Sequence, residues 1–574
     1  MKNTLLSFLL LPILLITALL LRFDAFDLFK TKNPKQTSIA LCGSVPGADV
    51  RTAANGKYIS AMPGWGNYSY PISTKNDSVQ FYFDQGVNMY YGYHMKESLA
   101  SFQEAARLEP TCAMAYWGQA LAMGPYYNAA HLYKKPENIP SVLKQMNRLA
   151  DQATKKEQAL IAVMNKRYSA DASDADRKLL NTAYAAKTRE LITQFPKDQD
   201  IKMLFVDAVM LIHAWDFWNN DGTPKPWTNE VVTLSEQVLK ENPNHPAALH
   251  YHIHLTEASR HPEVALPNAD KLRDQLPGVA HMVHMSSHEY ERNGFFLKAV
   301  DVNDRADAAL LQYDSLAKNL NLVKHSPHYF AVQTYCAMSA GLYKTGMHAA
   351  NRLRKSVGPT YESPYDQYLF MLPELTLVRL GKWDEILKDT AKIEPKWTYA
   401  TLLRNFARGM AYVNTGAGEK AKAELNSLLE RAKDPILTKR RIPFNSFTPI
   451  ANIAGEILTA AIAFNDKNYD KTIASLNNAI EIEDGLIYTE PNDWPIPARQ
   501  FLGAYLLKMN KPAVAESIYS EDLIWNPGNG WSAIGLAQSL KAQKKTKELA
   551  KIERSYKQSF SAAEQLPTGS VFLR

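Results

Sequence analysis

Histidines are concentrated in one stretch of this chain, where they recur at a fixed interval. Eight of the fourteen histidines lie within residues 245–288. His250 and His254 are four residues apart, and so are His284 and His288. The two pairs are one interval apart, because 284 − 250 = 34 and 288 − 254 = 34. Residues four apart share one face of a helix, so each pair predicts two imidazoles on a common face.

Imidazoles that converge in their neutral form are good ligands for zinc, copper or iron. The predicted metal ligands are His250, His254, His281, His284 and His288, with His325 and His328 as additional ligands from a later helix. Glu257 and Glu289 are candidates for a ligand, for an orienting group or for a catalytic base. A polar, pH-sensitive binding groove without a metal remains the alternative.

Three observations limit this chemistry. The zinc-protease motif H-E-x-x-H is absent, because Arg292 stands where the second histidine would follow His288 and Glu289. His252 points away from the 250/254 face, so we expect it to be a packing residue. His261 precedes a proline and is expected in a turn.

The interval of 34 residues predicts repeated pairs of antiparallel helices. With Val79 at position 1 of a repeat, Gly86, Phe102 and Pro110 fall at positions 8, 24 and 32. Large residues fill the space between the paired helices, small residues allow their close approach, and proline ends the second helix. Further turns are predicted at Gly294, Gly346 and Gly381.

The same register places the histidines on neighbouring helices. Pro246 and Ala280 are each expected to open the first helix of a repeat, about 8–10 Å apart by ordinary helix packing. Apolar spacing between the turns is helical, and we find no convincing alternating strand pattern. The sequence therefore predicts an all-α fold, a right-handed α-solenoid of roughly nine to twelve helix pairs.

Several blocks resemble a family of bacterial tetratricopeptide-repeat (TPR) proteins that contain a His-rich repeat segment. The similar blocks are Phe81–Gly86, Ser101–Pro110, Cys112–Gly118, Leu121–Pro125, Leu249–His288, Glu490–Trp494, Arg499–Ala504, Asn526–Trp531 and Gly535–Leu540. The resemblance spans about residues 60–560 and implies a TPR-like fold, whose A-helix positions 2, 5, 9 and 12 line a concave groove. It implies little about activity. The chain departs from the family at residues 66–70, where members often carry histidines, and at Tyr93, where they tend to carry asparagine.

The stretch from Glu490 to Arg499 contains a second unusual group of charged residues. Glu257, Glu490, Asp493 and Arg499 are candidates for contacts to a ligand in the groove. A structural corner is the alternative, because Asp493 precedes a helix whose N-terminal end favours a negative charge.

The N-terminus has the pattern of an export signal. Lys2 precedes an apolar run from Leu5 to Leu21, which predicts a signal peptide or signal anchor over residues 1–22. We expect a linker and irregular lead-in over 23–75, an N-terminal TPR-like array with the His-rich groove over 76–360, and a C-terminal array over 361–565. The body is then expected at the cell envelope, on the periplasmic or extracytoplasmic side, with membrane contact through the N-terminal segment only.

Composition excludes other classes. The net charge of +7 over 574 residues is small, and no basic run suggests nucleic acid. The three cysteines, Cys42, Cys112 and Cys336, are far apart and do not imply a disulfide framework.

Three functions are consistent with these patterns. The first is an exported scaffold whose groove binds a protein or peptide partner or a ligand, centred on the multi-histidine site. The second is a metal storage or delivery protein. The third is an envelope metalloenzyme that uses the histidines with Glu257 or Glu289. Whether any catalysis occurs stays open at this point.

Overall fold

The computed structural model describes residues 50–169, 174, 176–440, 444–564 and 566–573. The predicted signal segment, most of the lead-in and Cys42 lie outside these residues. The described residues all belong to one compact unit, Ala40–Arg574.

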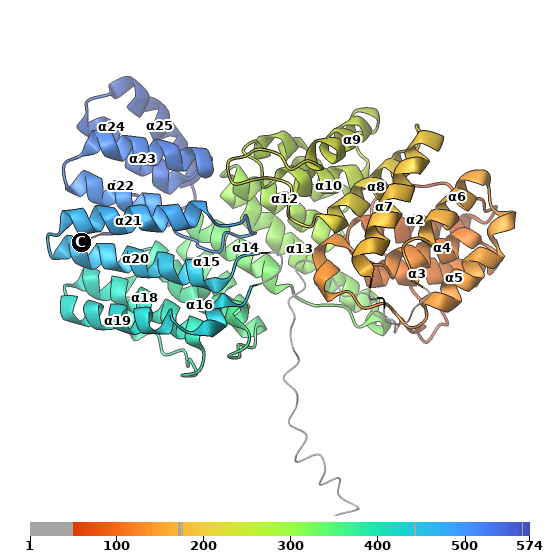
Figure 1. The fold of residues 1–574 in the computed structure, drawn as a ribbon, viewed down its shortest axis with the longest axis horizontal. Coiled ribbons are helices and arrows are strands. Elements are labelled where there is room, and N and C mark those ends of the chain that lie inside the picture. The colour runs from red at the N-terminus through yellow and green to blue at the C-terminus, as the bar shows by residue number, and fades with distance from the viewer. Residues whose placement is uncertain (1–49, 170–173, 175, 441–443, 565, 574) are drawn as a thin grey trace, which may run out of the picture. The chain divides into compact units, whose positions relative to one another are not determined.

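The described residues are all-α, as predicted. Consecutive helices pack against each other as hairpins along the whole unit, among them α2 with α3, α12 with α13 and α20 with α21 (Figure 1). The α-helices are α2 (Asp77–Tyr91), α3 (Met95–Leu108), α4 (Ala113–Ala122), α5 (Ile139–Arg148), α6 (Lys155–Met164), α7 (Arg177–Gln194), α8 (Gln199–Ile212), α9 (Thr228–Glu241), α10 (Pro246–Thr256), α11 (Leu266–Gln275), α12 (Ala280–Arg292), α13 (Phe296–Leu316), α14 (Pro327–Ser339), α15 (Tyr343–Ser356), α16 (Pro364–Arg379), α17 (Trp383–Lys388), α18 (Thr398–Thr415), α19 (Gly418–Arg431), α20 (Phe447–Asn465), α21 (Tyr469–Asp484), α22 (Ala498–Lys508), α23 (Pro512–Trp525), α24 (Gly530–Ala542) and α25 (Thr546–Ser559).

Short 3-10 turns join some of these helices. They are η2 (Tyr127–Leu132), η3 (Ala150–Gln152), η4 (Pro262–Ala265), η5 (Lys318–Leu320) and η6 (Pro435–Thr438). Extended pairing within the described ranges amounts to two isolated bridges, at Trp218 with Pro224 and at Arg440 with Ser446. The fold is therefore a TPR-like α-solenoid in which helix pairs supply nearly all regular structure.

Aromatic rings pack directly against glycines of the neighbouring helices, so the helices approach each other closely. A Cβ atom placed on Gly86 would lie 2.7 Å from Phe102, and one on Gly118 would lie 2.3 Å from the same ring. The predicted small and large positions of the first repeat thus meet in space. Near the C-terminus the same spacing recurs around one ring, in the order Gly503, Tyr519 and Gly535.

One predicted turn is misplaced. Gly294 and Gly381 lie in turns with a left-handed backbone, with φ of 75° and 65°. Gly346 instead lies inside α15, and the left-handed turn before that helix is made by Gly341, with φ of 73°. Gly346 is there as a small residue, since a Cβ would lie 3.4 Å from Thr376 of α16.

A single helix among the described residues is long and apolar enough to cross a membrane. It is α20, and 67% of its apolar window is buried inside the protein. Because α20 packs against α18 and α21, we interpret it as a core helix.

The histidine-bearing helices begin where the repeat register placed them. α10 opens at Pro246, where proline suits the first helical turn, and the side chain of His245 accepts a hydrogen bond from the Ala248 amide. α12 opens at Ala280. α10 packs against α12, and α12 packs against α14, so the three helices lie together in the middle of the ribbon (Figure 1).

Candidate metal centre

Six buried histidines from these three helices form two groups. His250 and His254 of α10 join His281 of α12, and the ligand atoms of these three lie within 4.8 Å of one another. We call this group the first triad. The second triad, defined by the same distance, comprises His284 and His288 of α12 and His328 of α14.

The first triad is tightly assembled. The Nε2 atoms of His250 and His281 are 3.0 Å apart, and the rings of His250 and His254 have centroids 4.9 Å apart. These three side chains are at most 3% exposed. The predicted convergence of the two helices therefore brings nitrogen atoms within reach of one metal ion.

Hydrogen bonds fix the ring orientation of two of these ligands. Nδ1 of His250 lies 2.6 Å from the carbonyl oxygen of Tyr91, which can only accept, so this nitrogen carries the proton. Nδ1 of His254 lies 3.0 Å from Oε1 of Glu257. A histidine that donates through Nδ1 to an oxygen presents the lone pair of Nε2 to a metal, as is common in metal sites.

The second triad has the same kind of support. Nδ1 of His284 lies 2.6 Å from Oδ1 of Asn303, whose Nδ2 donates to the Ala299 carbonyl and so fixes the amide orientation. Nε2 of His284 is buried without a hydrogen-bond partner. The rings of His284 and His328 have centroids 4.8 Å apart.

Glu490 lies close to histidines of both triads. It lies in the segment between α21 and α22, and its Oε2 is 3.1 Å from Nε2 of His288 in the second triad. A carboxylate oxygen of Glu490 also lies within 4.8 Å of ligand atoms of His254 and Glu257. The sequence predicts Glu490 as a contact in the groove and not as a metal ligand.

Burial keeps the imidazoles neutral. It lowers the pKa of His254 and of His284 to about 3, and that of His250, His281 and His288 well below the ordinary value, with neighbouring histidines adding to the effect. Neutral imidazole is the form that binds metals. Burial also raises the pKa of Glu257 to about 8. A cation placed among these groups would favour the ionised carboxylate.

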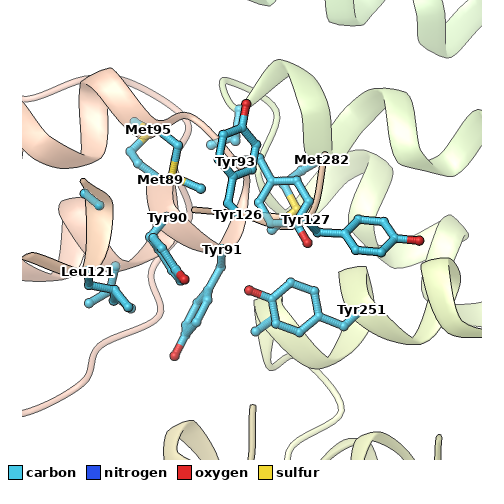
Figure 2. Close-up of a cluster of buried hydrophobic side chains, with 14 of the residues drawn as sticks. Met89, Tyr90, Tyr91, Tyr93, Met95, Leu121, Tyr126, Tyr127, Tyr251 and Met282 are labelled. Carbon is cyan, nitrogen blue, oxygen red and sulfur yellow. The ribbon is translucent and has the colours of Figure 1, made fainter. Parts of the chain in front are cut away.

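Tyrosines from the first repeat cover the first triad. The ring centroid of Tyr93 lies 4.6 Å from that of His250 and 5.2 Å from that of His281. Tyr91, at the end of α2, meets Tyr251 of α10 edge to face at 6.3 Å (Figure 2). The turn that carries Tyr93 fits because of Gly92, where a Cβ would lie 2.4 Å from Val279, next to the start of α12.

This cover corrects one expectation. Position in the repeat predicted that the histidines line an open groove, whereas those of both triads are at most 3% exposed. The turn between α2 and α3 covers the first triad, and it also brings Nε2 of His94 to 3.5 Å from the His281 amide. The sequence held no local signal for this contact, because the two segments belong to different repeats.

The remaining predicted residues lie outside the triads. His325 is 47% exposed in its side chain and pairs with Asp307. Glu289 is buried on α12 but belongs to neither triad, and burial together with Glu257 raises its pKa. His252 contacts Asn268 on the other side of α10, as expected, and His261 is exposed beside Glu263.

A cavity of about 840 Å³ is lined in part by the segment that carries Glu490. Asp493 and Arg499 line it together with Tyr488 and Thr489, which directly precede Glu490. Arg499 forms a two-pronged ion pair with Asp484, at 2.6 and 2.7 Å, so much of its charge is already matched. The residues that line this cavity include no histidine of either triad.

No family model and no curated protein matches this chain. Solved structures with stacked helix pairs are similar at low identity. The human IFIT1 dimer with m7Gppp-AAAA is 11% identical, with 86% of this chain and 92% of that chain covered and a TM-score of 0.31. Yeast Tom70 is 11% identical, with coverages of 84% and 93% and a TM-score of 0.28. The human IFIT1 dimer with PPP-AAAA is 12% identical, with coverages of 86% and 92% and a TM-score of 0.29. Similarities of this size carry no argument about ligand or partner.

Proposed function

We propose that this TPR-like scaffold binds a transition-metal ion, zinc, copper or iron, at the first triad. The observation that carries the proposal is the set of three buried imidazoles, two of which have Nδ1 held by an oxygen acceptor. Such a set leaves the Nε2 lone pairs of His250 and His254 available to an ion, which would replace the proton that Nε2 of His281 now shares with Nε2 of His250. Nitrogen ligands of this kind suit these three ions.

Burial favours this function over recognition of a peptide by the histidines. A side chain that is at most 3% exposed cannot contact a partner that docks on the surface. Buried polar atoms without partners are also costly, by about 1–3 kcal/mol each, and Nε2 of His254 and Nδ1 of His281 are two such atoms. A bound metal ion would satisfy Nε2 of His254 directly.

The proposal places the ion inside the protein and leaves the outer surface available for a protein or peptide partner, the usual role of helical repeats. We further propose an extracytoplasmic location, supported by the apolar run from Leu5 to Leu21. Both are extensions of the scaffold function and do not affect the metal proposal.

Elemental analysis of untagged protein tests the metal proposal. We expect stoichiometric retention of one kind of ion after purification, and loss of that ion from the first triad in His254→Ala. His261→Ala is the matched control, since its side chain is 79% exposed and belongs to neither triad. Protein that neither contains metal nor takes up zinc, copper or ferrous ion when these are added would refute the proposal.

A further inference from the structure

The second triad has the features of a separate metal position. It draws His284 and His288 from α12 and His328 from α14, and shares no residue with the first triad. All three side chains are at most 1% exposed. Three buried nitrogen donors within 4.8 Å of one another are as suitable for zinc, copper or iron as those of the first triad.

The hydrogen bonds of these rings also leave buried ring nitrogens without partners. Asn303 holds Nδ1 of His284, which leaves the Nε2 lone pair without a partner. Both ring nitrogens of His288 are likewise buried without a hydrogen-bond partner. Buried donors and acceptors are nearly always satisfied in folded proteins, so these nitrogens require an explanation, and a cation bound by Nε2 of His284 and Nε2 of His288 supplies one.

The two positions are close enough to share a ligand. The ring centroids of His281 and His284, one from each triad, lie 6.2 Å apart on the same helix. Glu490 approaches both sides, with Oε2 3.1 Å from Nε2 of His288 and a carboxylate oxygen within 4.8 Å of a ligand atom of His254. A carboxylate has two oxygens and can bind one ion with each.

Charge supports the same arrangement. Two divalent ions bring four positive charges into a buried region, where unmatched charge is costly. The described residues around the triads include three buried carboxyl groups, Glu257, Glu289 and Glu490, with the positive charge of Arg292 near them. Bound metal ions would compensate the negative charge of these carboxylates inside the protein.

We propose that the centre holds two transition-metal ions, one at each triad, with Glu490 as a carboxylate ligand shared between them. This inference rests on the proposed function, because it adds a second ion to the one at the first triad. It assigns His284, His288 and His328 to a metal position of their own.

Zinc titration of metal-free, full-length protein tests the inference. Dialysis against zinc followed by elemental analysis should give two ions per chain in the wild type and one in His328→Ala. His325→Ala is the matched control. His325 lies just before α14, the helix that carries His328, but belongs to neither triad, so this variant should keep two ions. His250→Ala should also keep one ion, at the second triad.

The variant Glu490→Gln tests whether Glu490 is a ligand of both ions. Loss of one carboxylate that serves both positions should raise the dissociation constants of both zinc ions by about tenfold or more. Unchanged affinity at either position overturns the shared role.

The outcomes separate the two proposals. One zinc ion per chain that His328→Ala leaves in place overturns the second position, while the function at the first triad stands. No zinc in any variant overturns both. Circular dichroism checks that each variant folds, and His328→Gln, which keeps a polar side chain of moderate size, replaces His328→Ala if that variant does not.

Discussion

Nδ1 of His254 lies 3.0 Å from Oε1 of Glu257, one turn further along the chain. Both side chains are 1% exposed, so the interaction is shielded from water. A carboxylate that holds the distal nitrogen of a metal-binding histidine fixes the ring and increases its basicity. We therefore propose a positioning role for Glu257 toward His254, one of the roles that the sequence left open.

Replacing Glu257 by alanine should weaken metal binding at the first triad by about 10–100-fold, the usual cost of losing such a support. Glutamine retains an oxygen acceptor and should cost less. Competition with a chromophoric chelator measures the affinity. Glu263→Ala is the control, because Glu263 pairs with the exposed His261 outside the centre. Equal affinity in Glu257→Ala and wild type would remove Glu257 from the site.

The ring of Tyr93 packs on both His250 and His281 and covers the first triad. Tyr93→Ala should speed the removal of metal by a chelator by about tenfold or more, since the hydrophobic shell of a metal site limits solvent access. Tyr93→Phe should release metal at the wild-type rate, because the Tyr93 hydroxyl has no hydrogen-bond partner among the described residues. Stopped-flow absorbance with the chelator in excess measures both rates, and equal rates for alanine and phenylalanine would contradict the role.

Gly503 should be intolerant of a side chain. A Cβ there would lie 2.3 Å from the ring of Tyr519, so Gly503→Ala should destabilise the protein by about 1–3 kcal/mol through overpacking. Gly418→Ala is the control, since nothing lies within 4 Å of its Cβ position and alanine favours helix. Thermal unfolding followed by circular dichroism should show a lower midpoint for Gly503→Ala only. A midpoint equal to that of the wild type would mean that the helix pair relaxes without cost.

Glu374 should make stability depend on pH. Burial raises its pKa to about 7, although Nε of Arg404 donates to it at 3.0 Å. Because the folded pKa exceeds the unfolded one, the folded state holds more protons between about pH 4.5 and 7. The free energy of unfolding therefore falls as pH rises through this window, by an order of 2–3 kcal/mol from this group.

Glu374→Gln removes that titration. The unfolding midpoint of the variant should change less than that of the wild type between pH 5 and pH 7.5, in scans at constant ionic strength. Glu430→Gln serves as the control, since Glu430 is 75% exposed in its side chain. A difference between Glu374→Gln and wild type that does not vary with pH would show that Glu374 titrates normally.

The helices that carry the histidines could be predicted because their signals are local. Pro246 and Ala280 mark helix starts one repeat apart, and the spacing of four residues places His250 with His254 on one face. Gly346 was misassigned to a turn because a glycine at a close helix contact and a glycine in a left-handed turn look alike in sequence. Only packing against Thr376 distinguishes them.

The closure of the site could not be predicted from spacing. Tyr93 and Glu490 reach the histidines from repeats far away in the chain, and the repeat period describes only neighbours. Gly92 must be small because Val279 packs against it, and this close contact lets the turn place the Tyr93 ring on the histidines. A single sequence does not reveal that these two segments are in contact. Sequence reasoning therefore found most of the nitrogen donors and missed what encloses them.

α12 contributes His281 to one triad and His284 and His288 to the other. A rotation or slide of this one helix would displace donors on both sides at once, so neither position can be adjusted alone. Ions held there would tie α10, α12 and α14 to each other through coordinate bonds. Added to the packing between the repeats, such bonds would make this central section the stiffest part of the array and the last to unfold.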